Sequence, residues 1–191
     1  MMPEATKKYK GHALFLDRDG VLNRRPGDSY VCSPEDFHWI DGSLKAVVDL
    51  SGVFGQIIVV TNQQGVGKGL MTLSDLQAVH RRMLQDVAEA GGRIDQVYAA
   101  TGIRHADSFN RKPAEGMAFE AMDDFPGMML DKAWMVGDTI RDMLFGHRLG
   151  MSTVLISHQQ INPGNLHHLV DYRFACLRDF AGFIIGKNTN M

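Results

Sequence analysis

Two aspartates stand two positions apart, directly after a short apolar run near the start of the sequence. Asp17 and Asp19 follow the residues Ala-Leu-Phe-Leu at 13–16, which have the composition of a buried strand. Two carboxylates at the end of a buried strand are costly unless a cation lies beside them. Mg²⁺, which prefers oxygen ligands, would be a suitable cation between these carboxylates. The pair therefore indicates either a metal-assisted reaction centre or a solvated turn that caps a helix.

A second group of polar residues follows another apolar run. Thr61, Asn62 and Gln63 come directly after the β-branched residues of 56–60. A hydroxyl group and the backbone amides of such a turn can hold phosphate oxygens, although polar residues after a strand are often an ordinary loop. A P-loop does not fit, because Asn62 stands where GxxxxGK needs its first glycine and Gly69 where it needs Ser or Thr.

Two further segments add cations and a second acidic pair. Arg111 and Lys112 precede a proline, and Asp138 and Asp142 follow the apolar run at 133–136. Lysine offers a point charge to a phosphoryl group and arginine a bidentate fork. Taken alone, the cations could lie in a solvated loop, and the aspartates could be a helix cap and a surface carboxylate.

Together, the four segments indicate phosphoryl chemistry. Carboxylates ligate Mg²⁺. A hydroxyl group and a lysine neutralise phosphate oxygens. A second carboxylate beside a nucleophilic one supplies acid and base catalysis.

Apolar runs typical of strands alternate along the chain with stretches of helical spacing, and these elements must position the residues above. The alternation predicts an α/β fold with a doubly wound parallel sheet. Ligands of such sheets bind at the carboxyl ends of strands, at a topological switch point, where Asp17, Thr61 and Asp138 fall. Strands are predicted at 13–16, 56–60, 94–100, 133–136 and 152–156, with a short one near Tyr172, and helices at 42–50, 72–90, 117–125, 140–149 and 177–185.

Composition limits the classes of function. The 191 residues, 45% hydrophobic and 22% charged, predict one domain over 11–186, with flexible ends at 1–10 and 187–191. The net charge of −2 disfavours a nucleic-acid partner. No apolar run reaches the roughly 20 residues of a membrane span, and the start lacks a secretory signal. Two isolated cysteines exclude a cysteine zinc cluster. We expect a cytoplasmic monomer without a membrane partner.

The four segments resemble the motifs of the haloacid dehalogenase (HAD) superfamily, which read DxDG(T/V), Thr, Lys and GDxxxD. Four stretches, FLDRDGVLN, VVTNQQGVGKG, RKPAEGM and MVGDTIRDM, are similar to the D-glycero-D-manno-heptose-1,7-bisphosphate 7-phosphatase and histidinol-phosphatase group. The similarity extends over about residues 12–157, with the motifs in order.

The resemblance implies a mechanism. Asp17 would attack phosphorus and form an aspartyl-phosphate, and Asp19 would act as acid and then as base. Mg²⁺ would be held by Asp17, the backbone carbonyl of Asp19 and Asp138. Thr61 and Lys112 would grip the phosphoryl group, with Asp142 as a partner of the metal or of Lys112. Substrate contacts would come from Asn23, Arg24, Tyr30, Asn62, Gln63 and Arg111.

Two departures from the group stand out. Its zinc loop carries three cysteines and a histidine, and the aligned ligand positions here hold Ala99, Thr101, Ser108 and Asn110. His105 alone cannot make a structural zinc site, so we expect none, and a shortened loop packed by Ile103 and Phe109. The loop after Asn23 is longer and carries Arg24 and Arg25, which would either bind a second anionic group or be solvated. No stretch is long enough for a large cap domain, which favours an open pocket.

The predicted function is that of a Mg²⁺-dependent phosphatase of a small phosphorylated metabolite, foremost a sugar (heptose) phosphate or bisphosphate. Histidinol phosphate is the alternative substrate, and the balanced charge argues against a nucleic-acid 3′-phosphatase. From another class, a receiver-like phospho-acceptor domain would use a similar set of groups, but a receiver places its acidic pair before the acceptor strand. Asp19 therefore favours the hydrolase. A catalytically dead binding protein is disfavoured because every motif residue is present.

Overall fold

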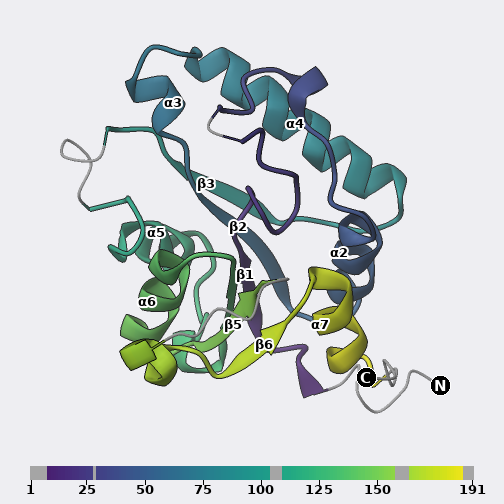
Figure 1. Ribbon diagram of the computed structural model, residues 1–191. Helices are drawn as coiled ribbons and strands as arrows, with labels where there is room; N and C mark the ends of the chain where they lie inside the picture. The colour runs from purple at the N-terminus through teal and green to yellow at the C-terminus, as the bar shows by residue number, and fades with distance from the viewer. Residues whose placement is uncertain (1–7, 28, 104–108, 158–163, 187–191) are drawn as a thin grey trace.

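Six parallel strands form a single sheet in the order β3-β2-β1-β4-β5-β6 (Figure 1). The computed structural model describes residues 8–27, 29–103, 109–157 and 164–186. The strands are β1 (Ala13–Leu16), β2 (Gln56–Asn62), β3 (Gln96–Ala100), β4 (Trp134–Gly137), β5 (Ser152–Ile156) and β6 (Tyr172–Phe174).

The sheet reverses its strand order between β1 and β4. From β1 the chain proceeds to β2 and β3 on one side, and it then crosses over to β4, β5 and β6 on the other. Leu14 of β1 pairs with Trp134 of β4, and Leu16 with Val136, so both strands end at the same edge. This is the switch point at which open α/β sheets bind ligands.

Helices cover both faces of the sheet (Figure 1). On one face lie α2 (Ser43–Ser51), α4 (Leu73–Glu89) and α7 (Leu177–Ile184), and on the other α5 (Gly116–Asp124) and α6 (Ile140–Arg148). Side chains of β1 alternate between the two cores, with Leu14 and Leu16 in the first and Phe15 in the second. Strands buried on both faces explain the continuous apolar runs of the sequence.

Short helical segments complete the structure. They are α3 (Gln64–Gly67) and three 3₁₀ helices, η1 (Pro34–Asp36), η2 (Leu130–Lys132) and η3 (Gly164–Leu169). In the described parts of the chain, the segments between β1 and β2, and between β2 and α5, hold only short helices, loops and the elements of these layers. The predicted fold class is therefore confirmed, without a large cap domain.

Some boundaries differ from the prediction. β3 begins at Gln96 rather than at residue 94, because the Asp95 side chain accepts the bond from Ile57 N (2.7 Å) that a longer strand would supply. Tyr9 lies in the segment predicted to be flexible, yet it is buried and stacks on Phe54 with ring centroids 5.3 Å apart. Residues 1–7 and 187–191 lie outside the described residues. Among the helices that the structure describes, none has the length and apolar composition of a membrane span.

Candidate active site

A cavity of about 230 Å³ opens at the switch point of the sheet. It is lined by residues that follow β1, β2 and β4 and by the segment before α5. Of the residues singled out from the sequence, it brings together Asp17, Asp19, Tyr30, Thr61, Asn62, Gln63, Arg111, Lys112 and Asp142.

Lys112 lies at the centre of this set. Its side chain is 2% exposed, and its Nζ lies 2.9 Å from Asp17 Oδ1 and 2.6 Å from Asp142 Oδ1. The other oxygen of Asp142 accepts hydrogen bonds from Thr139 N (3.0 Å) and Thr139 Oγ1 (2.6 Å), which caps α6. Although burial opposes its charge, the two carboxylates raise the pKa of Lys112. The lysine therefore stays cationic and neutralises the nucleophile candidate.

Asp17 and Asp138 face each other across the ends of β1 and β4. Asp17, Asp138 and Asp142 each offer an oxygen within 4.8 Å of the other two. Burial, reinforced by the neighbouring carboxylates, raises the pKa of Asp17 to about 7 and that of Asp138 to about 6. Gly20 makes the approach possible, because at its φ of 95° a Cβ would lie 2.0 Å from Asp138 Oδ2.

The donor set fits a hard divalent cation. Asp17 and Asp138 supply carboxylate oxygens, whereas Lys112 and Thr139 already engage both oxygens of Asp142. The backbone carbonyl oxygen of Asp19 lies near the same two carboxylates. One arginine contacts this oxygen together with the carboxylates of Asp17 and Asp138. Oxygen ligands of this kind are those that Mg²⁺ prefers.

Arg25 provides that contact. Its Nε donates to Asp19 O at 3.0 Å, and its Nη2 lies 2.8 Å from Asp138 Oδ1 and 4.0 Å from Asp17 Oδ2. Arg24 points elsewhere: it pairs with Asp41 at 2.8 Å, and its side chain is 62% exposed and outside this cavity. The arginine that lines this cavity is therefore Arg25, and not Arg24 as predicted.

The Asp19 side chain turns away from these ligands. Its Oδ1 accepts from Asn23 Nδ2 and Arg18 Nη2, both at 2.9 Å, and its Oδ2 from Gln63 Nε2 at 2.6 Å. Burial opposes ionisation, but Arg18 and the hydrogen bonds lower the pKa of Asp19 overall. Asn23 is fully buried and holds Asp19, so it does not face the cavity as predicted for a substrate contact.

The amides after β2 hold the site together. Gln63 Nε2 donates to Thr61 Oγ1 at 2.8 Å. The Asn62 side chain donates to Lys112 O (3.1 Å) and accepts from Lys112 N (3.0 Å), which fixes the backbone of the lysine. The predicted phosphate-gripping pair, Thr61 and Lys112, is therefore tied together through the end of β2.

Tyr30 and Arg111 lie farther from the carboxylates, around α3. The Tyr30 hydroxyl accepts from Gln64 Nε2 (2.9 Å) and Lys68 Nζ (3.0 Å). Arg111 is largely buried, and its Nη2 approaches Gln64 Oε1 at 3.4 Å. Both side chains line the cavity, where they can face the part of a ligand beyond its phosphate.

Known proteins are similar to this chain over most of its length. A family model described as HAD-hydrolase-like matches residues 109–179. The D-glycero-alpha-D-manno-heptose-1,7-bisphosphate 7-phosphatase of Mycobacterium tuberculosis is 33% identical over 173 residues, which cover 90% of this chain and 91% of that protein. The chain belongs to this family of HAD phosphatases. The D-glycero-beta-D-manno-heptose-1,7-bisphosphate 7-phosphatase of Neisseria meningitidis serogroup B is 30% identical over 184 residues, covering 92% of this chain and 96% of that protein.

A solved structure of a heptose bisphosphate phosphatase has a similar fold. The D,D-heptose 1,7-bisphosphate phosphatase from B. bronchiseptica, complexed with magnesium and phosphate, superimposes with a TM-score of 0.84 at 26% identity. The match covers 92% of this chain and 99% of that one. The family resemblance predicted from the motifs is therefore confirmed.

The loop that the resemblance aligns with a zinc-binding loop is only partly described here. Residues 104–108 lie outside the described residues, and they include His105 and Ser108, which stands at one of the aligned positions without being a zinc ligand. The expected packing of the loop by Ile103 and Phe109 is wrong, because these side chains are 42% and 62% exposed. Phe109 instead lies against Phe119 on the surface of α5, with ring centroids 6.3 Å apart.

Sequence reasoning placed two features incompletely. One is Arg25, which it left open between an anion contact and a solvated side chain, and which contacts Asp138 and the Asp19 carbonyl oxygen. The other is a contact between Arg18 Nη1 and His80 Nε2 at 3.2 Å, beneath Asp19. Arg18 stood in the quoted motif, but no local signal pairs it with a histidine 62 positions away.

Proposed function

We propose that this chain is a Mg²⁺-dependent phosphatase that removes one phosphate from a sugar bisphosphate, foremost a heptose 1,7-bisphosphate, through an aspartyl-phosphate on Asp17. The observation that carries the proposal is the position of Asp17 between the Lys112 ammonium group and Asp138, with Asp19 two residues away on the same loop. Its relatives, which share nearly the whole length of the chain, are named for this reaction.

The chain's own groups account for the first step. An oxygen of Asp17 attacks phosphorus, the bond from phosphorus to the ester oxygen breaks, and that oxygen takes a proton from Asp19. Bound Mg²⁺ would supply positive charge to Asp17 and the phosphate oxygens. Lys112, whose Nζ lies 2.9 Å from Asp17 Oδ1, also supplies positive charge, and both cations would favour the ionised form of Asp17.

Asp19 changes its task in the second step. A water attacks the phosphorus of the aspartyl-phosphate, gives its proton to Asp19, and releases inorganic phosphate from Asp17. The lowered pKa of Asp19 keeps its carboxylate ionised, so that it can accept this proton. In the first step, the negative charge of the bound phosphate raises the pKa of Asp19 and favours the protonated acid.

The walls of the cavity favour a substrate with two anionic groups. Besides Lys112, the side chains of Arg25, Arg111 and Arg141 line it. One phosphate at Asp17 leaves arginines for a second phosphate, which guanidinium groups bind through paired hydrogen bonds. Histidinol phosphate carries a protonated amine in place of a second phosphate, and the same arginines would repel this positive charge. The arginines therefore support a bisphosphate over histidinol phosphate.

The receiver-like alternative loses its support. Family membership places the chain among phosphatases, and Asp19 offers the acid and base that turnover requires. We further propose that the enzyme works on its small substrate in the cytoplasm, where the free thiols of Cys32 and Cys176 would stay reduced.

Phosphate release tests the function. The substrates would be the α and β anomers of heptose 1,7-bisphosphate, histidinol phosphate and a 3′-phosphorylated oligonucleotide, each with Mg²⁺ and with EDTA. We expect Mg²⁺-dependent release from a heptose bisphosphate that is lost in Asp17→Asn and kept in Asp123→Asn, a matched change at an exposed aspartate of α5. Release that persists in Asp17→Asn, or no release from any substrate, would overturn the proposal.

A further inference from the structure

A buried arginine lies directly behind Asp19. Arg18 has no exposed surface, although it is the residue between the two motif aspartates. Its Nη2 lies 2.9 Å from Asp19 Oδ1 and 3.0 Å from Asp19 Oδ2. A buried guanidinium group needs partners in fixed positions, and the Asp19 carboxylate is one of them.

His80 is the other partner. Its Nε2 lies 3.2 Å from Arg18 Nη1. Since a guanidinium group can only donate, Nε2 must accept, and His80 is then neutral with its proton on Nδ1. Burial, together with the charge of Arg18, lowers the pKa of His80 to about 3, so the ring stays neutral across the physiological range.

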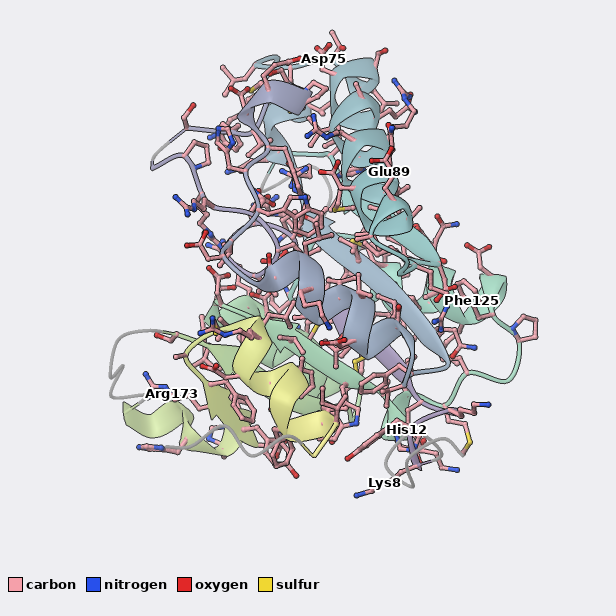
Figure 2. All side chains as sticks on the ribbon, turned by 90° about the vertical axis from the view of Figure 1, so that its right-hand side faces the viewer. Lys8, His12, Asp75, Glu89, Phe125 and Arg173 are labelled. Atoms are coloured by element: carbon pink, nitrogen blue, oxygen red, sulfur yellow. The ribbon has the colours of Figure 1, made fainter. Side chains whose placement is uncertain are left out.

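The helix that carries His80 is firmly placed. His80 lies within α4, between the fully buried Val79 and Met83, which pack in the core against the sheet. Figure 2 shows α4 lengthwise, with Asp75 near its start and Glu89 at its end. The imidazole is therefore a fixed acceptor against which Arg18 can be aligned.

The guanidinium group depends on these two contacts. Within the described part of the chain, Arg18 Nε has no hydrogen-bond partner. The histidine at Nη1 and the carboxylate at Nη2 thus set the rotation of the planar group. Without an acceptor at position 80, Nη1 would be buried unsatisfied, and the guanidinium group would turn away from Asp19 to find another partner.

We propose that His80 is a positioning residue for the reaction, which through Arg18 holds the Asp19 carboxyl group in the orientation that delivers a proton to the leaving oxygen. The inference rests on the proposed function. In the step concerned, the bond between phosphorus and the ester oxygen breaks as that oxygen takes the proton of Asp19. A misplaced Asp19 then slows the reaction of substrates with poor leaving groups, which need the proton, more than that of substrates with good leaving groups.

The leaving-group dependence of kcat/KM tests the role. This ratio includes the steps through departure of the leaving group, so hydrolysis of the aspartyl-phosphate drops out. The substrates are the best heptose bisphosphate, whose alkoxide leaves poorly, and p-nitrophenyl phosphate, whose phenolate leaves without a proton. The variants are His80→Leu, which removes the acceptor, and His80→Gln, which restores one. Arg82→Ala serves as control, an exposed side chain of α4 paired with Asp86.

We expect His80→Leu to lower kcat/KM for the heptose bisphosphate about tenfold or more, and for p-nitrophenyl phosphate less than about threefold. His80→Gln should recover most of the loss, and Arg82→Ala should match the wild type. Equal losses on both substrates, or none, would overturn the inference. If His80→Leu fails to fold, His80→Ala takes its place. A wild type that turns over neither substrate would overturn the proposed function and this role with it.

The hydrogen bond itself can be checked without turnover. Nitrogen chemical shifts of the His80 ring should show the neutral form with the proton on Nδ1 from pH 8 to pH 5. A proton on Nε2, or a charged ring at pH 6, would contradict the Arg18–His80 contact whether or not the enzyme is active.

Discussion

The ammonium group of Lys112 touches two carboxylates that would otherwise repel each other. It lies 2.9 Å from Asp17 and 2.6 Å from Asp142, with almost no access to water. Lys112→Met would leave buried carboxylates without their cation, and the free energy of unfolding should fall by about 3–5 kcal/mol. Urea denaturation at pH 8 in EDTA measures this loss. An unchanged midpoint would mean that the pair is not stabilising. Phosphate release should fall at least about 100-fold.

His80 makes the free energy of unfolding depend on pH, because protonation of its buried ring destabilises the fold. Burial and the charge of Arg18 lower its pKa in the folded state to about 3, below the ordinary value of 6.5, so a proton favours the unfolded chain. The stabilising contribution is complete above pH 6.5 and is lost as the pH falls toward 3. Between pH 7 and pH 4.5 the wild type should lose about 2 kcal/mol more than His80→Gln. Parallel pH profiles of the two proteins would contradict this.

Arg24 and Arg25 are adjacent in sequence but face different surroundings, which makes them a matched pair. Arg25 lines the cavity beside Asp138, whereas Arg24 pairs with Asp41 outside it. Arg25→Ala should raise KM for a bisphosphate about tenfold, because a guanidinium contact to an anion is lost. Arg24→Ala should leave KM within twofold. Steady-state kinetics decides, and equal effects of the two changes would refute the assignment.

At the scale of elements, α4 begins with a reciprocal cap. Thr72 Oγ1 accepts from Asp75 N at 3.1 Å, and Thr72 N donates to Asp75 Oδ2 at 2.8 Å. Thr72→Ala should lower the free energy of unfolding by about 1 kcal/mol. Because neither Thr72 nor Asp75 lines the cavity, kcat should not change. Thermal denaturation and phosphate release on the same sample test both statements.

The same cap shows what the sequence could predict. Thr72 and Asp75 stand at capping-box spacing, and apolar residues follow at helical intervals, so α4 was predicted nearly to the residue. The rule on strand ends predicts that Asp17, Thr61 and Asp138 lie together, and the family resemblance adds Lys112. α3 was missed, since a four-residue helix containing two glycines has no periodicity to detect.

Contacts that depend on side-chain direction could not be predicted. Arg24 and Arg25 carry the same charge, and only the course of the loop decides which one turns inward. The family resemblance implies a substrate contact for Asn23, yet its side chain is buried and donates to Asp19. His80 reaches Arg18 only because α4 packs in the core on the same face of the sheet as α2. Local spacing contains no information on such pairs.

At the scale of the whole molecule, the carboxylates of the site couple stability to the cation. Mg²⁺ at 100 times its Kd should stabilise the fold by about 2.7 kcal/mol, which raises Tm by roughly 5–10 °C. Asp138→Asn should abolish most of this shift. Melting curves in Mg²⁺ and in EDTA measure it, with Na⁺ at equal ionic strength as control. A shift that persists in Asp138→Asn would place the cation elsewhere.

The switch between β1 and β4 also governs when activity can arise. The groups that meet there come from distant parts of the chain; Arg25 and Asp138, for example, are 113 positions apart. A ribosome-bound chain that ends before β4 has the nucleophile but none of the acidic pair that follows β4. Pairing of such distant strands is slow compared with helix formation. Recovery of phosphatase activity during refolding therefore reports the joining of the two halves of the sheet, while helical circular dichroism reports earlier events.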